Sequence, residues 1–316
     1  MKQILPLLPD FCQEIILGLP EETREELEEI RLRAEFPPEF ITSKGVWNPG
    51  DVHWPVFRLQ QAQEMLQRIS RYSLYTLDEE LRRGYVTVRG GHRIGLAGRV
   101  LTENGHVLRL REVTFFNIRL AKQKLGAADP VIPSLYQQGH WLSTLLIGAP
   151  LTGKTTLLRD LARQISEGVP KQTIQGSKTG IVDERSEIAG CVSGIPQNRV
   201  GTRTDVLDAC PKAEGMMMMI RSMSPDVLIV DEIGRREDTD ALLEALNAGV
   251  SIMASAHGYS LEQIARRPTL AALLNSGLFE RYIVLSRKKD FQRSVSRLQI
   301  LDKAGQTLLS REGVWH

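Results

Sequence analysis

The residues with the clearest chemistry lie in one continuous run: Gly148, Ala149, Pro150, Leu151, Thr152, Gly153, Lys154, Thr155 and Thr156. This run matches the pattern G-x-x-x-x-G-K-[ST] and stands between an apolar stretch that predicts a strand and a stretch that predicts a helix. Glycines let such a loop turn tightly, so that its backbone N–H groups point at phosphate oxygens. We therefore expect all nine residues to bind a nucleotide. The alternative is a plain glycine turn with an exposed lysine.

Within this loop each polar side chain has its own expected contact. The Lys154 ammonium should reach the β- and γ-phosphates of ATP, the Thr155 hydroxyl should ligate Mg²⁺, and Thr156 should contact the α-phosphate. Leu151 departs from the commonest form of the loop, in which a third glycine stands at this place. The pattern tolerates this residue, so only the shape of the loop is in doubt.

Two acids follow a second apolar stretch, Val227–Val230, which predicts a buried strand. Residues at the carboxyl end of such a strand can reach the ligand crevice of a parallel sheet. We expect Asp231 to hold the magnesium ion through water. We expect Glu232 to act as general base on the attacking water, which favours hydrolysis over transfer to a small molecule. The alternative is an acidic strand end that caps a neighbouring helix.

Two further strand ends could supply catalytic groups. Glu184 follows the apolar stretch 179–182 and is a candidate for a second carboxylate near the γ-phosphate. His257 follows a predicted strand at 250–253 and could sense the γ-phosphate or orient the water. A surface turn for Glu184 and a structural role for His257 remain open.

The order of elements divides the chain. Alternating strands and helices over residues 136–316 predict an α/β domain with a mostly parallel sheet. Residues 1–121 predict a smaller α+β domain of helices followed by a small antiparallel sheet. Within it, 20–33 is expected to be helical, and Gly90-Gly91 to form a turn. The polar, proline-bearing segment 122–135 is the expected linker. Further helices are expected at 60–73, 77–83 and, in the second domain, over most of 205–223.

Composition narrows the function classes. The 40 basic and 38 acidic residues nearly balance, which gives no strong sign of a nucleic-acid partner. The basic, glycine-rich run 89–99 is better explained as a hairpin than as a nucleic-acid contact. Three widely spaced cysteines indicate reduced thiols in a cytoplasm and no zinc site. Without an apolar run of ~20 residues, we expect no transmembrane segment, and a chain that is either soluble or held at a membrane by partners.

The whole set of motifs resembles a known family. The order of P-loop, IVDERSEIAG, SPDVLIVDEIGR and SAHG is similar to the secretion ATPases of the RecA-like/AAA superfamily, which carry an acidic box and a histidine box at these places. EIRLRAEFP, SLYTLDEELRRGYVTVRGGHRIGLAGR, NIRLA and RTDVLDACPKAEGMMMMIRSMSPDVLIVDEIGR resemble the stage III sporulation protein AA family more closely. This resemblance covers nearly the whole chain.

The resemblance implies a Mg²⁺-dependent ATPase of the mother cell of endospore-forming bacteria, working with the channel to the forespore. It implies a ring, expected to be a hexamer, at the cytoplasmic face of the membrane, with membrane proteins of the same sporulation system as partners. Such rings use an arginine from a neighbouring subunit to stabilise the transition state. The candidates are Arg93, Arg99, Arg119, Arg203 and Arg221, and the alternative for each is a solvated or salt-bridged structural arginine.

Two other functions fit the nucleotide motifs. A nucleic-acid-dependent ATPase of RecA type would bind polynucleotide with a steep dependence on salt. A nucleotide-gated scaffold would bind ATP and rarely hydrolyse it, although the intact Glu232 argues against this reading.

Overall fold

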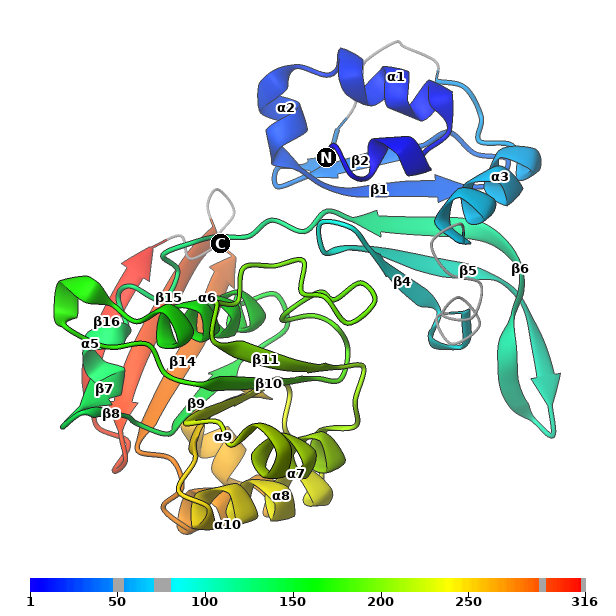
Figure 1. The fold of residues 1–316 in the computed structure, drawn as a ribbon. Coiled ribbons are helices and arrows are strands. Elements are labelled where there is room, and N and C mark those ends of the chain that lie inside the picture. Colours follow the sequence, from blue (N-terminus) through cyan, green and yellow to red (C-terminus); the bar gives the residue numbers. More distant parts are fainter. Residues whose placement is uncertain (48–53, 71–80, 290–293, 314–316) are drawn as a thin grey trace. The chain divides into compact units, whose positions relative to one another are not determined.

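The chain forms two compact units, Met1–Lys122 and Gln123–His316 (Figure 1). The structure is a computed structural model, and it describes residues 1–47, 54–70, 81–289 and 294–313. The expected helix at 77–83 and the last residues of the one at 60–73 lie partly outside these ranges.

The first unit is built on a six-stranded antiparallel sheet of order β3-β2-β1-β6-β5-β4. Its strands are β1 (Leu27–Arg33), β2 (Glu39–Thr42), β3 (Gly45–Val46), β4 (Tyr85–Val88), β5 (His92–Glu103) and β6 (His106–Arg119). Its helices are η1 (Leu5–Leu7), α1 (Asp10–Gly18), α2 (Glu21–Glu26) and α3 (Leu59–Ser70). Gly90 and Gly91 join β4 to β5 with positive φ angles of 86° and 73°, the conformation of a tight hairpin turn.

The helix expected at 20–33 is wrong beyond Glu26, because Leu27–Arg33 forms β1 in the middle of this sheet. Ile30 and Leu32 are buried at strand spacing, while a register shift between Leu27 and Glu29 puts Leu27 out of phase with them. A bulge of this kind breaks the period of two and leaves apolar residues three apart, which imitates a helical pattern.

The second unit contains an eight-stranded sheet of order β11-β10-β12-β13-β9-β14-β15-β16. The six strands from β11 to β14 are parallel, and β15 and β16 add an antiparallel edge. The strands are β9 (Thr144–Gly148), β10 (Thr179–Asp183), β11 (Thr204–Asp208), β12 (Val227–Val230), β13 (Ser251–His257), β14 (Arg281–Lys289), β15 (Ser294–Asp302) and β16 (Thr307–Gly313). A separate two-stranded ribbon joins β7 (Tyr136–Gln137) to β8 (His140–Trp141).

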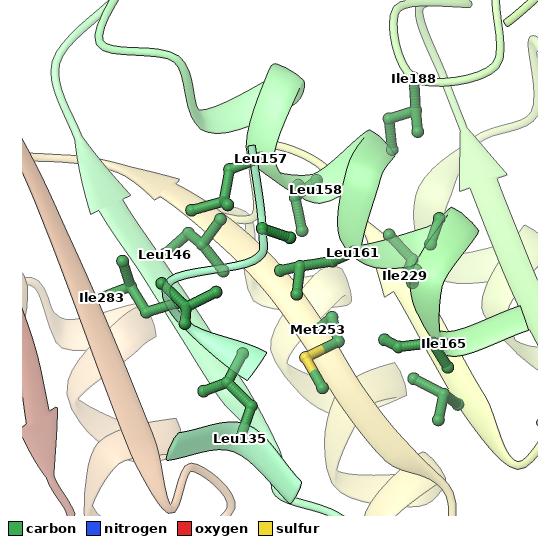
Figure 2. Close-up of a cluster of buried hydrophobic side chains, with 14 of the residues drawn as sticks. Leu135, Leu146, Leu157, Leu158, Leu161, Ile165, Ile188, Ile229, Met253 and Ile283 are labelled. Atoms are coloured by element: carbon green, nitrogen blue, oxygen red, sulfur yellow. The ribbon is translucent and has the colours of Figure 1, made fainter. Parts of the chain in front are cut away.

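Helices cover both faces of the large sheet, with α6 (Lys154–Glu167) on one face and a group on the other (Figure 1). That group is α7 (Lys212–Met223), α8 (Arg236–Asn247), α9 (Leu261–Ala265) and α10 (Pro268–Asn275). Short helices α5 (Ile132–Leu135) and η2 (Pro170–Gln172) complete the unit. Figure 2 shows Leu158, Leu161 and Ile165 of α6 packed with Ile229 and Met253 of the sheet. This packing fixes α6, and with it the loop at its N-terminus.

The expected helix over 205–223 is correct only in its second part. Thr204–Asp208 forms the edge strand β11, Ala209 turns the chain at φ +54°, and Pro211 precedes the first residue of α7. Proline suits the start of a helix and interrupts a continuous one, so Pro211 separates the two elements. In α7, Met216 and Met219 are buried and Met218 is exposed.

The segment expected as a linker, 122–135, differs from that expectation. The two units divide between Lys122 and Gln123, and Ala128, Val131, Ile132 and Leu135 are buried in the core of the second unit. Small residues and prolines made the segment look like a loop, yet its apolar side chains fill the space beside α6. A carboxylate oxygen of Asp160, buried in α6, accepts the Ala128 N–H at 2.9 Å and holds the segment in place.

Candidate functional site

The nine-residue loop joins β9 to α6, as its motif requires. Gly148 ends β9, where an added Cβ would lie 2.4 Å from Thr152 Oγ1 and 3.1 Å from the Leu285 carbonyl oxygen, so a side chain cannot fit. Thr152 Oγ1 donates to the Ala149 carbonyl at 2.8 Å, and Gly153 has φ +93°. The loop therefore closes into a turn that the helix N-terminus follows directly, which is the arrangement that binds phosphate.

Leu151 stands at the tip of this loop with φ +62° and is 85% exposed. The left-handed conformation costs a non-glycine residue about 1–2 kcal/mol. This is why glycine is common at the position and why leucine is tolerated there: the backbone carries the strain, and the side chain meets no neighbour that would exclude it.

Lys154 is 6% exposed, and its ammonium donates to the carbonyl oxygens of Gly148 at 2.9 Å and Ala149 at 3.1 Å. Burial lowers the pKa of Lys154, and the nearby Asp231 and Glu232 carboxylates oppose that change. The ammonium thus holds the loop closed from inside. In the proposed complex, phosphate oxygens would replace these two carbonyl oxygens as its acceptors.

Thr155 and Asp231 lie in contact across 76 residues of sequence. Thr155 Oγ1 donates to Asp231 Oδ2 at 2.8 Å, and the buried Ser255 Oγ donates to Asp231 Oδ1. Ser255 belongs to β13, which pairs with β12, and the hydroxyl therefore lies close enough to bond the acid that follows β12. Sequence reasoning assigned Ser255 no role, because only the order of strands reveals the contact.

Hydroxyl and carboxylate oxygens are the donors that Mg²⁺ prefers, and the ion needs only one or two protein ligands because it keeps several waters. Thr155 and Asp231 therefore fit a magnesium ion bound together with phosphate. Within the described ranges no group of three or more His, Cys, Asp or Glu could hold a metal by itself.

Glu232 has φ +51°, and its backbone N–H donates to Asp231 Oδ1 at 2.9 Å and to Ser255 Oγ at 3.0 Å. Its carboxylate accepts from Arg185 Nη1 at 2.8 Å, while the side chain stays 39% exposed. The backbone of Glu232 is thus fixed to Asp231 and Ser255, and its side chain is the part that can turn toward a water molecule.

The two acids that follow one another at the end of β10, Asp183 and Glu184, have different surroundings. Asp183 is 2% exposed and accepts the N–H groups of Glu187, Ile188 and Ala189 at 2.8–2.9 Å. Glu184 instead accepts from Lys212 Nζ at 2.5 Å. Both line one small cavity with Asp231 and Glu232, so the structure brings Glu184 to the predicted site.

We expect Asp183 to give the folded chain a measurable pH dependence. Burial raises the pKa of Asp183 from 3.8 to about 6, against the three N–H donors. Between about pH 4 and 6 the folded chain therefore holds more protons than the unfolded chain, so this group's part of the unfolding free energy falls as pH rises and is constant above that range. The shift corresponds to at most about 3 kcal/mol.

Urea unfolding of the parent and of Asp183→Asn across this range measures the effect. Relative to the variant, the parent should lose stability as pH rises from about 4 to about 6. Asp205→Asn, which changes an exposed acid of β11, should track the parent. A parent–variant difference that is the same at every pH would show that Asp183 titrates normally.

His257 ends β13 directly beside Gly148 of β9, its partner in the parallel register. Its carbonyl oxygen accepts from Arg267 Nη1 at 2.5 Å, and its ring packs edge-on to Tyr259 with 6.2 Å between centroids. The histidine thus lies next to the loop, and its role toward the nucleotide stays a prediction.

The five arginine candidates have separate surroundings. Arg93 stacks on the Tyr85 ring at 3.5 Å, Arg99 lies 3.8 Å from Glu112, and Arg203 donates to the Gly176 carbonyl. Arg119 and Arg221 are exposed. A role for any of them at a neighbouring subunit stays a prediction.

Comparison with known proteins defines the class first. Over 94% of this chain and 81% of the other, the structure superposes on the ATPase DotB of Legionella pneumophila with TM-score 0.61 at 16% identity. The pilus retraction motor PilT, solved with ADP, gives TM-score 0.59 at 17% identity over 93% and 83%. The second unit therefore has the RecA-like P-loop ATPase fold of these proteins, preceded here by a smaller α+β domain.

The family follows from sequence. Residues 2–308 match the family described as "Sporulation stage III, protein AA". Stage III sporulation protein AA of Bacillus subtilis is 55% identical over 319 residues, covering 99% of both chains. The chain belongs to the stage III sporulation protein AA family. Across the described residues, no helix combines the length and apolarity needed to cross a membrane.

Proposed function

We propose that this chain binds ATP with Mg²⁺ and hydrolyses it to ADP and phosphate. The hydrogen bond from Thr155 to Asp231 carries the proposal, because it brings the hydroxyl of the phosphate-binding loop and the acid of β12 into one site. Glu232, adjacent to that acid, supplies a carboxylate that can turn toward the site.

In this proposal each side chain has one task. The loop N–H groups and Lys154 bind the phosphates, while Thr155 and Asp231 hold the metal ion, which would neutralise phosphate charge. Glu232 accepts the proton of the attacking water as general base. Ser255 keeps the Asp231 carboxylate in place through its hydrogen bond.

We propose further that hydrolysis does mechanical work for the sporulation channel between mother cell and forespore. The 55% identical relative is named as a stage III sporulation protein, and the similar solved structures are described as an ATPase and a pilus retraction motor. In this proposal the chain assembles as a ring, as a hexamer, at the cytoplasmic face of the membrane with membrane proteins of that system.

Phosphate release by the purified chain, measured together with its particle mass, tests this function. ATP with Mg²⁺ should give release that EDTA abolishes, and ATP should favour the ring over smaller species. Absence of release under every condition, including with the membrane partner present, would contradict hydrolysis. A monomer under all conditions would contradict the ring.

A further inference from the structure

A buried lysine lies in the acidic cavity beside Asp231 and Glu232, and no step proposed above uses it. Lys212 is the first residue of α7, and its side chain is 9% exposed. The cavity is lined by Asp183, Glu184, Arg185, Glu187, Lys212, Asp231 and Glu232. Lys212 therefore shares a space with the acid that contacts Thr155 of the phosphate-binding loop.

Close packing fixes the position of Lys212. One turn further along α7, a Cβ added to Gly215 would lie 2.6 Å from Val182 Cγ1 and 2.9 Å from Cys210 Sγ. The first turn of α7 thus lies directly against β10, whose last residue precedes Glu184. Because only glycine permits this approach, the lysine is set at the cavity by the backbone and not by a flexible loop.

The charges in the cavity explain why a cation stands there. Burying an ammonium costs several kcal/mol unless it is paired. Lys212 Nζ meets Glu184 Oε2 at 2.5 Å, while Arg185 is paired with Glu232. Five carboxylates and two cations line the cavity, so a terminal phosphate held by Lys154 and the metal ion would be further stabilised if one of these two cations became available to it.

Lys212 is the better placed of the two cations for such an exchange. Its side chain is 9% exposed against 58% for Arg185, and a charge-assisted hydrogen bond is stronger where water is excluded. A terminal phosphate offers three strong acceptor oxygens and nearly two charges, whereas Glu184 offers one charge. The phosphate would therefore compete well with Glu184 for the ammonium.

We propose that the Lys212 ammonium breaks its ion pair with Glu184 and binds the terminal phosphate of ATP. The site then prefers a nucleoside triphosphate over a diphosphate. This inference rests on the proposed function of the same site. It assigns Glu184 a second task, since that carboxylate holds the ammonium in place when the terminal phosphate is absent.

Equilibrium affinities for ADP and for the non-hydrolysable analogue AMP-PNP, both with Mg²⁺, test the exchange. In Lys212→Met, AMP-PNP should bind about tenfold more weakly, the loss of one charge-assisted hydrogen bond, while ADP affinity stays within about twofold. Lys212→Gln, which keeps a hydrogen-bond donor but removes the positive charge, should also weaken AMP-PNP binding, by no more than Lys212→Met does. Lys178→Met, a change at an exposed lysine before β10, should behave as the parent.

Glu184→Gln separates this proposal from a purely structural ion pair. Removing the competing carboxylate should raise the AMP-PNP-to-ADP preference, the opposite of the lysine variants. A structural pair predicts lowered unfolding midpoints for both variants and an unchanged preference, and that result would overturn the inference. If the parent binds AMP-PNP and Lys154→Ala does not, the proposed site stands whatever Lys212 does. If the parent binds neither nucleotide, the proposed function fails and this inference with it.

Discussion

Replacing Glu232 with Gln is expected to lower the rate of ATP hydrolysis by about 10²–10⁴-fold while nucleotide binding is kept, because a general base is lost. Glutamine has the same length and can accept the hydrogen bond that Arg185 donates at 2.8 Å. It also leaves the N–H contacts to Asp231 and Ser255 in place. It lacks the negative charge of the carboxylate, and with that charge the ability to take a proton from water. Phosphate release at saturating ATP and Mg²⁺ measures the hydrolysis rate, and the affinity for AMP-PNP measures nucleotide binding.

The control for this variant is Glu237→Gln, the same chemical change at an exposed acid in the first turn of α8. It should hydrolyse ATP at the parent rate. If Glu232→Gln also keeps the parent rate, Glu232 is not the base. If it loses AMP-PNP binding as well, the carboxylate serves the binding site and not the chemical step.

The sequence predicted the position of Glu232 at the end of a buried strand, but it did not predict the contact that its side chain makes. Four apolar residues followed by two acids predict a buried strand whose end faces a ligand, and β12 has this form. The partner of Glu232, Arg185, follows another strand 47 residues earlier. Pairs of this kind depend on which strands are neighbours, and a single sequence does not state the strand order.

The same limit applies to Ser255 and Lys212. Each is polar in a stretch that reads as ordinary strand or helix, and each acquires meaning only from an acid on another element. The turn from Gly148 to Lys154 could be predicted from sequence because the hydrogen bonds that shape it are local: Thr152 donates to the Ala149 carbonyl, and Lys154 donates to the carbonyls of Gly148 and Ala149.

Where the expected helices and strands differ from the fold, a local irregularity obscured the spacing of the apolar residues. The bulge in β1 left Leu27 and Ile30 at helical spacing, and the edge strand β11 is only half-buried, so no apolar alternation marked it. In the segment before α5, small buried residues such as Ala128 read as a linker, although the core beside α6 needs them. Pattern reading detects large apolar side chains far better than small ones.

The second large effect is expected for Lys154→Ala, which should weaken ATP binding by at least about 100-fold. In the proposed complex the ammonium bonds the β- and γ-phosphates, and two hydrogen bonds between charged groups contribute about 1.5–3 kcal/mol each. Alanine provides no donor in place of the ammonium, which now donates to the carbonyl oxygens of Gly148 and Ala149. Isothermal titration with AMP-PNP and Mg²⁺ measures the loss.

Folding of the Lys154→Ala chain is measured separately, because the change leaves the Gly148 and Ala149 carbonyls without their buried donor and is expected to lower the unfolding midpoint. A nucleotide that binds only the folded state raises that midpoint by mass action. The parent and Lys171→Ala, a change at an exposed lysine of η2, should therefore both be stabilised by AMP-PNP. A cooperative unfolding transition that AMP-PNP does not move identifies a folded chain without a nucleotide site. Equal stabilisation of Lys154→Ala and parent would mean that the loop is not where the phosphates bind, and the hydrolysis proposed from Thr155 and Asp231 would fall with it.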